Sequence, residues 1–324
     1  MARLRIAALV CAAAAAGTAA VTGTAGGRGG AEVAVFYYAW WGTPGHDGDW
    51  RHWSQYGSRP PGAVASSFYP LRGPYSSADH KVVRAHMREI AEAGVDTVVV
   101  SWWGPGSPEA ARLPLVAATA AARGLRVAIH IEPWRDRTPA GVTAAIGDLR
   151  GQGFTDFYVY DSSLTPDAEW AAALSELHGV RVFANTPFPG RARAGGFDGL
   201  YTYDVYVYNG DSFVRMCASA RRLGLLCAPS VGPGYDARAA TGDVRTRPRR
   251  QGARYDAMWR RAIRAKPDLV TITSYNEWHE GTQIESARAG GSYLSYEGAY
   301  GLHGRAAERA YVDRTAYWIE RLRS

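Results

Sequence analysis

Short apolar runs recur along the chain, and most are followed by a stretch with helical periodicity. The runs are rich in β-branched and aromatic residues, the composition that is typical of strands. Each is apolar almost throughout, which indicates a strand that is covered on both faces. Eight runs are found, at Val33–Trp40, Thr97–Trp103, Arg126–Pro133, Phe157–Ser162, Arg181–Thr186, Gly199–Val205, Leu225–Pro233 and Leu269–Trp278.

The intervening stretches place apolar residues at helical spacing. In the first, Val83, Met87 and Ile90 fall on one face. A glycine follows several of these stretches, as expected where a helix ends before a strand. The predicted helices are His80–Ala93, Leu113–Arg123, Pro139–Gln152, Pro166–His178, Ser212–Leu223 and Gly252–Lys266.

Eight strands alternating with helices predict a single (β/α)8 TIM barrel over residues 31–324. A doubly wound open sheet is the alternative. Such a sheet usually carries a glycine-rich phosphate-binding turn after its first strand, and the segment Phe36–Gly45 does not match one.

Residues 1–30 read as a signal peptide followed by a flexible lead-in. Arg3 and Arg5 precede an apolar run that is too short to span a bilayer, and small residues suitable for cleavage follow it. Lipid anchoring at Cys11 is less favoured because Val10 before it is not small. We therefore expect a secreted protein with no stable membrane insertion. The two cysteines that remain, Cys217 and Cys227, fit either one disulfide or two buried thiols.

Composition adds to this picture. The chain has 11 Trp and 19 Tyr but 8 Phe, and aromatic rings with polar handles suit a wet binding cleft. The formal net charge is +7, carried almost entirely by arginine. No basic helix or basic repeat with interleaved aromatics is present, so a nucleic-acid partner is not indicated. No cofactor is expected, and we expect a monomer.

Every predicted strand changes from apolar to polar or aromatic at the same end. In a TIM barrel this carboxyl end carries the active site. Flat aromatic rings suit sugar faces, and Asn, His and carboxylates suit sugar hydroxyls. The residues predicted to bind a carbohydrate here are Tyr38, Trp102, His130, Glu132, Tyr160, Tyr203, Asn276 and His279.

Three carboxylates gather after the last strand, at Glu277, Glu280 and Glu285. Cleaving a glycosidic bond requires one carboxylic acid and a second carboxylate, and two such groups close together push their pKa values apart. The segment contains no Lys or Arg, which argues against a salt-bridged structural loop. Glu277 and Glu280 are therefore the predicted catalytic pair.

Other chemistries fit less well. His130, Glu132, His279 and Glu280 could meet around a metal ion, but the segment lacks the H-E-x-x-H pattern, so no metal is predicted. The chain also has no G-x-S-x-G elbow for a serine hydrolase.

Motifs along nearly the whole predicted domain resemble glycoside hydrolase family 99, the endo-α-1,2-mannosidases and mannanases. The matching segments are Phe36–Tyr38 with Trp41, Asp49–Trp53, Ala65–Ser77, Ser101–Gly106, His130–Arg137, Tyr158–Ser162, Phe197–Tyr203, Pro229–Asp236 and Ile272–Glu285.

The resemblance implies a (β/α)8 barrel that cleaves α-1,2-mannosidic bonds internally with retention. It implies that Glu277 deprotonates the substrate 2-hydroxyl, which attacks to form a 1,2-anhydro sugar, and that Glu280 is the acid and base. It further implies that Trp102 packs on the sugar next to the cleavage point.

The loop after the seventh strand departs from the family pattern. Arg249 lies in an arginine-rich run that resembles a family loop, and it is predicted either to bind substrate or to sit in a solvated loop. The leading Asn of that loop is replaced by Arg245, and the segments after Tyr203 and Asp236 differ as well. Two rival functions therefore remain, a related hydrolase for another α-linked glycan and a non-catalytic sugar-binding barrel.

Overall fold

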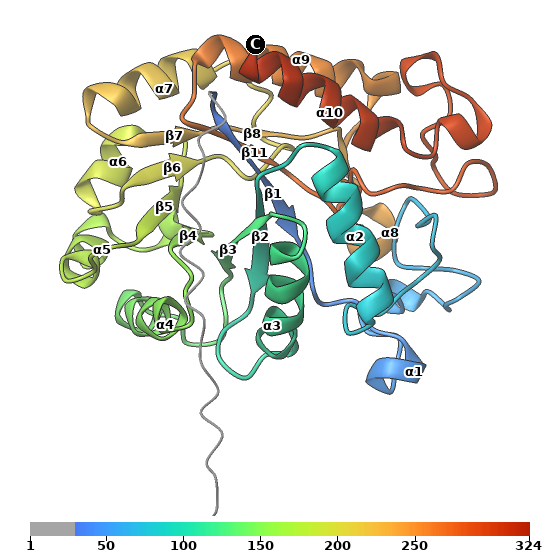
Figure 1. Cartoon of the computed structure of the whole chain (residues 1–324), viewed down its shortest axis with the longest axis horizontal. Helices are drawn as coiled ribbons and strands as arrows, with labels where there is room; N and C mark the ends of the chain where they lie inside the picture. Colours follow the sequence, from blue (N-terminus) through green and yellow to red (C-terminus); the bar gives the residue numbers. More distant parts are fainter. Residues whose placement is uncertain (1–29) are drawn as a thin grey trace, which may run out of the picture.

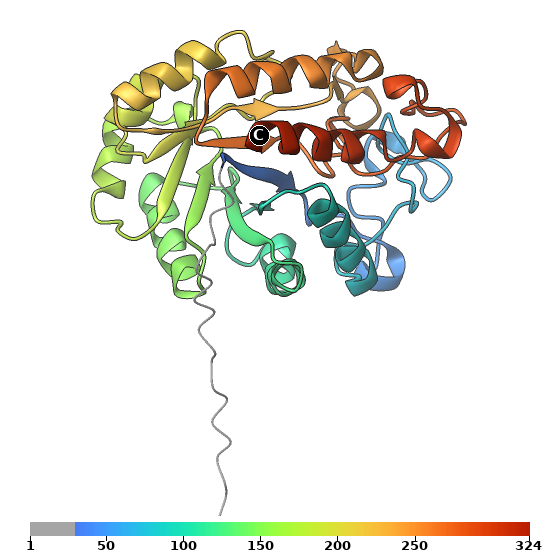
Figure 2. The same ribbon diagram turned by 45° about the horizontal axis from the view of Figure 1, so that its top comes forward.

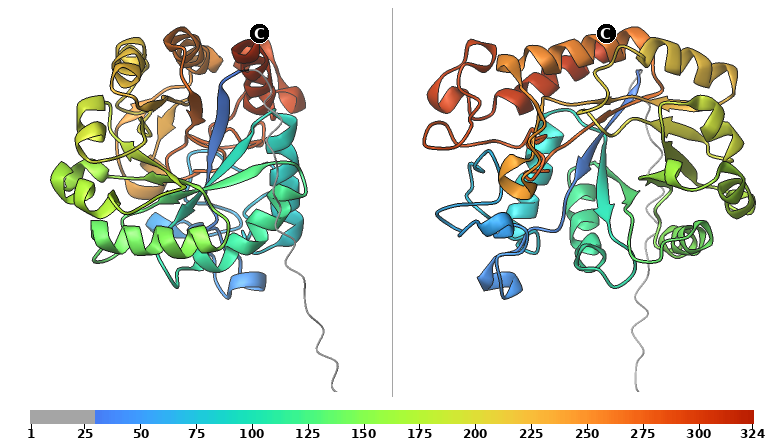
Figure 3. Two further views of the ribbon diagram at one scale, coloured as in Figure 1. Left: turned by 60° about the vertical axis from the view of Figure 1, so that its left-hand side comes forward. Right: turned by 180° about the vertical axis from the view of Figure 1, so that it is seen from behind.

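A computed structural model describes residues 30–324, which form a ring of parallel strands surrounded by helices (Figures 1 and 3). The predicted signal peptide lies outside the described residues, apart from Gly30. The strand order is β7-β6-β5-β4-β3-β2-β1-β11-β8. The strands are β1 Glu32–Tyr37, β2 Thr97–Trp102, β3 Arg126–Ile131, β4 Asp156–Val159, β5 Arg181–Asn185, β6 Gly199–Tyr201, β7 Leu226–Ala228, β8 Ser230–Val231 and β11 Leu269–Ile272.

The ring closes through the predicted seventh strand, which the structure divides into β7 and β8. Its first half pairs with β6 and its second half with β11. The break falls at Pro229, which has no N–H to donate to a strand ladder. Its carbonyl still accepts a hydrogen bond from the Thr271 amide at 3.1 Å. The barrel prediction is confirmed, and the open-sheet alternative is excluded.

The predicted helices are confirmed in position, although α3 begins earlier than expected, at Pro108. The Ser107 side chain caps this helix by accepting from the Ala110 amide at 3.1 Å, and a proline suits the first helical position. Helices α6 and α10 were not predicted from the sequence. The main helices are α2 His80–Glu92, α3 Pro108–Ala121, α4 Pro139–Gly151, α5 Asp167–Leu174, α6 Pro189–Ala194, α7 Phe213–Arg222, α9 Ala253–Ala265 and α10 Ala310–Arg323.

Helix α10 lies beside α9 on one side of the barrel (Figures 1 and 2). Asp256 of α9 joins the two helices, because it accepts hydrogen bonds from Arg314 Nε at 2.8 Å and from Trp318 Nε1 at 2.7 Å. None of the helices in the described range 30–324 is long and apolar enough to cross a membrane.

The core has two layers because successive side chains of a strand point to opposite faces. Along β1, Val33, Val35 and Tyr37 pack outward beneath the helices, whereas Ala34 and Phe36 fill the barrel interior. The interior is strongly aromatic towards the carboxyl ends of the strands. The core of the barrel thus continues without a break into the region where the predicted site residues lie.

The two cysteines form a disulfide. Cys217 in α7 is bonded to Cys227 in β7, and both side chains are fully buried. This bond fixes a helix to the strand that follows it. Of the two alternatives that the sequence left open, the structure has the disulfide.

Candidate active site

The predicted catalytic segment follows β11 directly. The sequence predicted a strand up to Trp278, but the strand ends at Ile272 and the chain turns back on itself. Ser274 stabilises this turn, since its hydroxyl accepts from the Glu277 amide at 2.8 Å and its amide donates to the Thr282 carbonyl at 3.0 Å. We call residues 273–285 the catalytic loop. Its local hydrogen bonds place both glutamates at the mouth of the barrel.

Glu277 is almost completely buried, with 2% of its surface exposed. Its Oε1 accepts a hydrogen bond from the His279 amide at 2.9 Å. Burial and the nearby charge of Glu280 raise the pKa of Glu277, whereas the backbone amides of His279 and Glu280 favour its ionised form. Of the two glutamates, Glu277 is therefore the one whose carboxylate is directly supported by backbone donors.

Glu280 is half-buried and lies among other carboxylates. Burial and the charges of Asp204 and Glu132 raise the pKa of Glu280 to about 8, while the Tyr203 hydroxyl acts in the opposite direction. The Glu280 carbonyl accepts from the Asp236 amide at 2.6 Å, which fixes the backbone. The pKa of both carboxyls is raised, so the pair holds a proton at neutral pH.

Two tyrosines from opposite parts of the barrel meet beside the pair. The hydroxyls of Tyr38 and Tyr203 are hydrogen-bonded to each other. Burial and neighbouring carboxylates raise the pKa of both hydroxyls, so both keep their protons. They can therefore supply hydrogen bonds to Glu280 or to a sugar.

Asn276 holds the end of β1 against the catalytic loop. Its Oδ1 accepts from the Tyr38 amide at 2.7 Å, and its Nδ2 donates to the Tyr38 carbonyl at 2.9 Å. The side chain is completely buried. Both polar atoms of its side-chain amide are hydrogen-bonded to protein, so Asn276 positions Tyr38 and has no unpaired atom for the sugar contact that the sequence predicted.

His130 and Glu132 lie together at the end of β3. His130 Nδ1 is 2.9 Å from Glu132 Oε1, and the Ser101 hydroxyl donates to the same oxygen at 2.8 Å. His130 Nε2 lies 2.8 Å from the Tyr201 hydroxyl, and its ring stacks on Tyr203 at 5.3 Å. This buried polar group orients the rings on one side of the glutamates.

His279 is fixed as a neutral imidazole. Its Nε2 donates to the His52 carbonyl at 2.7 Å, which leaves Nδ1 as the lone-pair nitrogen, 3.9 Å from Glu277 Oε1. Burial lowers the pKa of His279 to about 4. A neutral neighbour does not stabilise negative charge on Glu277, which helps to keep that carboxylate basic.

Aromatic rings form one wall of the site. Trp40 is half-buried and stacks on His52 at 4.6 Å, with Tyr38 at 4.7 Å and His279 at 5.6 Å. Trp102 of β2 is nearly buried and meets Trp134 edge-on at 5.5 Å. Such rings provide flat faces of the kind that bind sugars.

Tyr160 approaches the glutamates from β4, and its hydroxyl donates to Asp204 at 3.3 Å. Burial raises the pKa of Asp204. Among the described residues, no group of three or more His, Cys, Asp or Glu side chains is arranged to hold a metal ion.

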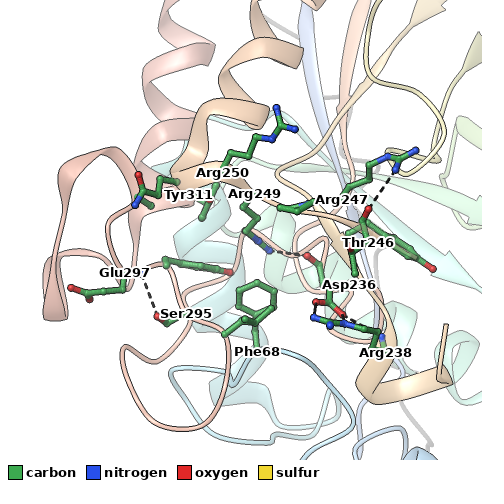
Figure 4. Close-up of a pocket in the computed structure, with 17 residues that line it drawn as sticks. Phe68, Asp236, Arg238, Thr246, Arg247, Arg249, Arg250, Ser295, Glu297 and Tyr311 are labelled. Atoms are coloured by element: carbon green, nitrogen blue, oxygen red, sulfur yellow. Dashed lines mark hydrogen bonds and ion pairs between the residues drawn. The ribbon is translucent and has the colours of Figure 1, made fainter. Parts of the chain in front are cut away.

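Arg249 lies apart from the pair, behind the catalytic loop. Its Nη2 donates to the carbonyls of Gly281 at 2.9 Å and Gln283 at 2.7 Å. Its guanidinium lies 4.5–4.8 Å from the rings of Phe68, Tyr296 and Tyr311 (Figure 4). The side chain is thus neither in a solvated loop nor beside the glutamates, and it supports the loop that carries them.

Comparison with known proteins agrees with the fold and with these contacts. The model of glycosyl hydrolase family 99 matches residues 30–324. The chain belongs to this family. A solved structure of the family 99 endo-α-mannosidase from Bacteroides thetaiotaomicron aligns with a TM-score of 0.79 and 31% identity, covering 90% of this chain and 97% of that one.

Vertebrate members of family 99 are similar to this chain over most of its length. A glycoprotein endo-α-1,2-mannosidase-like protein from Danio rerio is 33% identical over 89% of this chain and 78% of its own. A glycoprotein endo-α-1,2-mannosidase from Xenopus laevis is 33% identical over 79% of this chain and 70% of its own. The chain is therefore a glycoside hydrolase of the endo-α-mannosidase family.

Two residues of the family 99 site were not predicted as site residues. His52 accepts the hydrogen bond that fixes His279, and it lies in the matching segment Asp49–Trp53, to which the sequence gave no role. Asp204 contributes to the raised pKa of Glu280. It follows the Tyr203 strand end, so its position at the carboxyl end of a strand was the available signal.

Proposed function

We propose that the chain is an endo-acting α-1,2-mannosidase that retains anomeric configuration through a 1,2-anhydro sugar. The observation that carries this proposal is the pair of Glu277 and Glu280 at the mouth of the barrel, in which the pKa of both carboxyls is raised. The names of the vertebrate relatives support the α-1,2 linkage.

Glu277 is the base in this scheme. Its carboxylate takes the proton of the substrate 2-hydroxyl, and that oxygen forms a bond to the anomeric carbon as the glycosidic bond breaks. In an α-mannoside the 2-hydroxyl is trans to the leaving group, so it can attack from the opposite face. The backbone donors to Glu277 support its ionised form before the substrate binds.

Glu280 is the acid and then the base. Its raised pKa keeps it protonated at neutral pH, so it can give its proton to the departing glycosidic oxygen. The resulting carboxylate then deprotonates a water that attacks the anomeric carbon. The anhydro ring opens, and O2 recovers its proton from Glu277. The two glutamates return to their starting states.

The purified protein should release an oligosaccharide from a mannan in which the mannose on the non-reducing side of the α-1,2 bond is extended through O3, because its 2-hydroxyl must be free to react. The anomeric configuration of the product is followed by NMR during the first turnovers. A matched substrate with a methyl group on the reacting O2 should not be cleaved, because that oxygen has no proton to lose. Cleavage of the O-methylated substrate at a comparable rate would contradict the anhydro intermediate, and an inverted product would contradict retention.

We also propose that the protein is exported after its leader is removed. The N-terminal pattern and the Cys217–Cys227 disulfide support this, because disulfides persist mainly in oxidising compartments. Expression of the full chain should release protein into the culture medium, and the N-terminus of that protein should begin near residues 18–30. Recovery of only uncleaved protein inside the cell would contradict export.

A further inference from the structure

A cavity of about 360 Å³ opens behind the catalytic loop (Figure 4). It is bounded by the hairpin of β9 Tyr235–Asp236 and β10 Thr246–Arg247, by the turn Arg250–Gly252, and by the loop at residues 294–299. Its volume lies in the range of small-molecule pockets. Four arginines and several aromatic rings line it.

The cavity carries an excess of two positive charges, since its lining holds four arginines and two carboxylates. Both carboxylates are already engaged. Asp236 accepts from Arg238 Nε at 2.9 Å, and Glu297 lies 2.7 Å from His303. In the described part of the chain, no carboxylate lies within 4.0 Å of the charged nitrogens of Arg247, Arg249 or Arg250.

Arg249 contributes a cation whose hydrogen-bonding capacity is only partly used. Its Nε and Nη1 are buried without a hydrogen-bond acceptor among the described residues. A buried polar group without an acceptor carries a desolvation cost that a bound acceptor would relieve. Arg250, by contrast, is exposed at the edge of the cavity. One cation is therefore held in place inside the cavity, and another stands free at its rim.

The cavity is adjacent to the acid of the catalytic pair. Gly281 lines it and directly follows Glu280. Tyr235 also lines it, and the charge of Glu280 contributes to raising the pKa of the Tyr235 hydroxyl. Under the proposed function Glu280 protonates the leaving oxygen, and on that basis the cavity is assigned to the leaving-group side of the bond that is cleaved.

We propose that this cavity binds an anionic substituent, a phosphate or a carboxylate, on the leaving-group portion of the glycan. Arg249 inside the cavity and Arg250 at its rim supply the charge, whereas the guanidinium of Arg247 is held by the Tyr206 carbonyl at 3.0 Å. Tyr235, Phe68 and Tyr296 supply faces for the sugar ring that bears the anion. The assignment of the anion to a glycan rests on the proposed function, whereas anion binding itself does not. The substrate class is thus an acidic mannan.

Calorimetry on the mature protein tests the binding directly, with mannose 6-phosphate, mannuronate, mannose and inorganic phosphate as probes. The two acidic sugars should bind more tightly than mannose and than inorganic phosphate, and less tightly as salt rises, because the rim charge is exposed to solvent. Arg250→Gln should weaken acidic-sugar binding about threefold or more, and Arg250→Lys less so. Arg193→Gln, an equal charge loss on α6, should not change it.

Three results would overturn the proposal. If the acidic sugars bind no more tightly than mannose, charge does not contribute to binding. Inorganic phosphate that binds as tightly as mannose 6-phosphate would show that the sugar ring is not recognised. An equal loss in Arg250→Gln and Arg193→Gln would place the site elsewhere. Thermal unfolding of each variant verifies that it is folded.

Kinetics separate this proposal from the proposed function. For an α-1,2-linked oligosaccharide with and without a phosphate on its leaving-group sugar, kcat/KM should favour the phosphorylated form, and Arg250→Gln should reduce that ratio. Cleavage of both forms at equal kcat/KM would contradict the acidic-mannan assignment alone. Tight acidic-sugar binding without any cleavage would instead contradict the proposed function alone.

Discussion

The proton of Glu280 is the residue-scale feature on which the proposed chemistry depends. The pKa of Glu280 is raised to about 8 by its partial burial and by the charges of Asp204 and Glu132, and each of these groups comes from a different strand end. Glu277, three residues away, has backbone donors that support its charge. The two glutamates of the same motif thus have different surroundings, and the proposed mechanism gives them different roles.

Replacing Glu280 with Gln should remove the acid while keeping the shape of the side chain. We expect kcat on an unactivated α-1,2-mannoside to fall by about 10²–10⁴-fold. For a substrate whose leaving group departs without protonation, the rate of the first step should fall far less. Steady-state and burst kinetics on both substrates measure this, with the exposed Glu320→Gln as control. A uniform loss on both substrates would argue against the acid role.

The same raised pKa predicts a pH-dependent stability. A carboxyl whose pKa is higher in the folded state stabilises the fold below its unfolded value, and that contribution is lost as pH rises through about 8. Glu280→Gln removes a carboxyl that is costly to ionise. The variant should therefore gain a few degrees in Tm over the wild type at about pH 9 relative to pH 5. A Tm difference that does not vary with pH would contradict the raised pKa.

At the scale of elements, the catalytic loop is held from both sides. On the side of α2, Glu285 accepts from the Tyr75 hydroxyl at 2.7 Å and from Trp278 Nε1 at 2.9 Å, and it lies 3.0 Å from His86. Behind the loop, Arg249 binds two of its carbonyls. Glu285, the third carboxylate of the segment, thus holds the catalytic loop in place.

Arg249→Met keeps the length of the side chain but leaves the carbonyls of Gly281 and Gln283 without their donor. We expect a loss of about 1–3 kcal/mol in the free energy of unfolding, together with a lower kcat, because the loop carries Glu280. Urea denaturation and steady-state kinetics measure the two effects. Arg193→Met on α6 serves as the matched control. Unchanged stability and kcat in Arg249→Met would show that the clamp is unimportant.

At the scale of the whole molecule, one ring of strands brings together segments that are distant in sequence. Tyr38 and Asn276 are separated by 238 positions yet share two hydrogen bonds, because β1 and β11 are neighbours where the barrel closes. The disulfide fixes the neighbouring part of the ring, where it joins α7 to β7, the first half of the strand that pairs with β11. Both features link local contacts to the closure of the barrel.

Removing the disulfide should destabilise the fold by about 2–3 kcal/mol, since its short loop restricts the unfolded chain. The variant Cys217→Ala with Cys227→Ala tests this by thermal unfolding. A reductant should lower the Tm of the wild type but leave that of the double variant unchanged. If the reductant does not alter the wild-type Tm, the bond does not contribute to stability.

The sequence by itself determined the fold class and the catalytic segment. The apolar runs report which residues are covered on both faces, and the motif from Asn276 to Glu285 is continuous along the chain. It also placed Tyr38, His130 and Tyr203 at the correct end of the barrel. These features are local or periodic, so they can be read without knowledge of long-range contacts.

The tertiary structure alone decided what each of these side chains does. It assigned Asn276 to holding β1, Arg249 to the back of the catalytic loop and His52 to the fixation of His279. It also chose the disulfide over two free thiols. These outcomes depend on partners brought together by ring closure, and hydrogen-bond partners and desolvation are properties of that three-dimensional neighbourhood rather than of position along the chain.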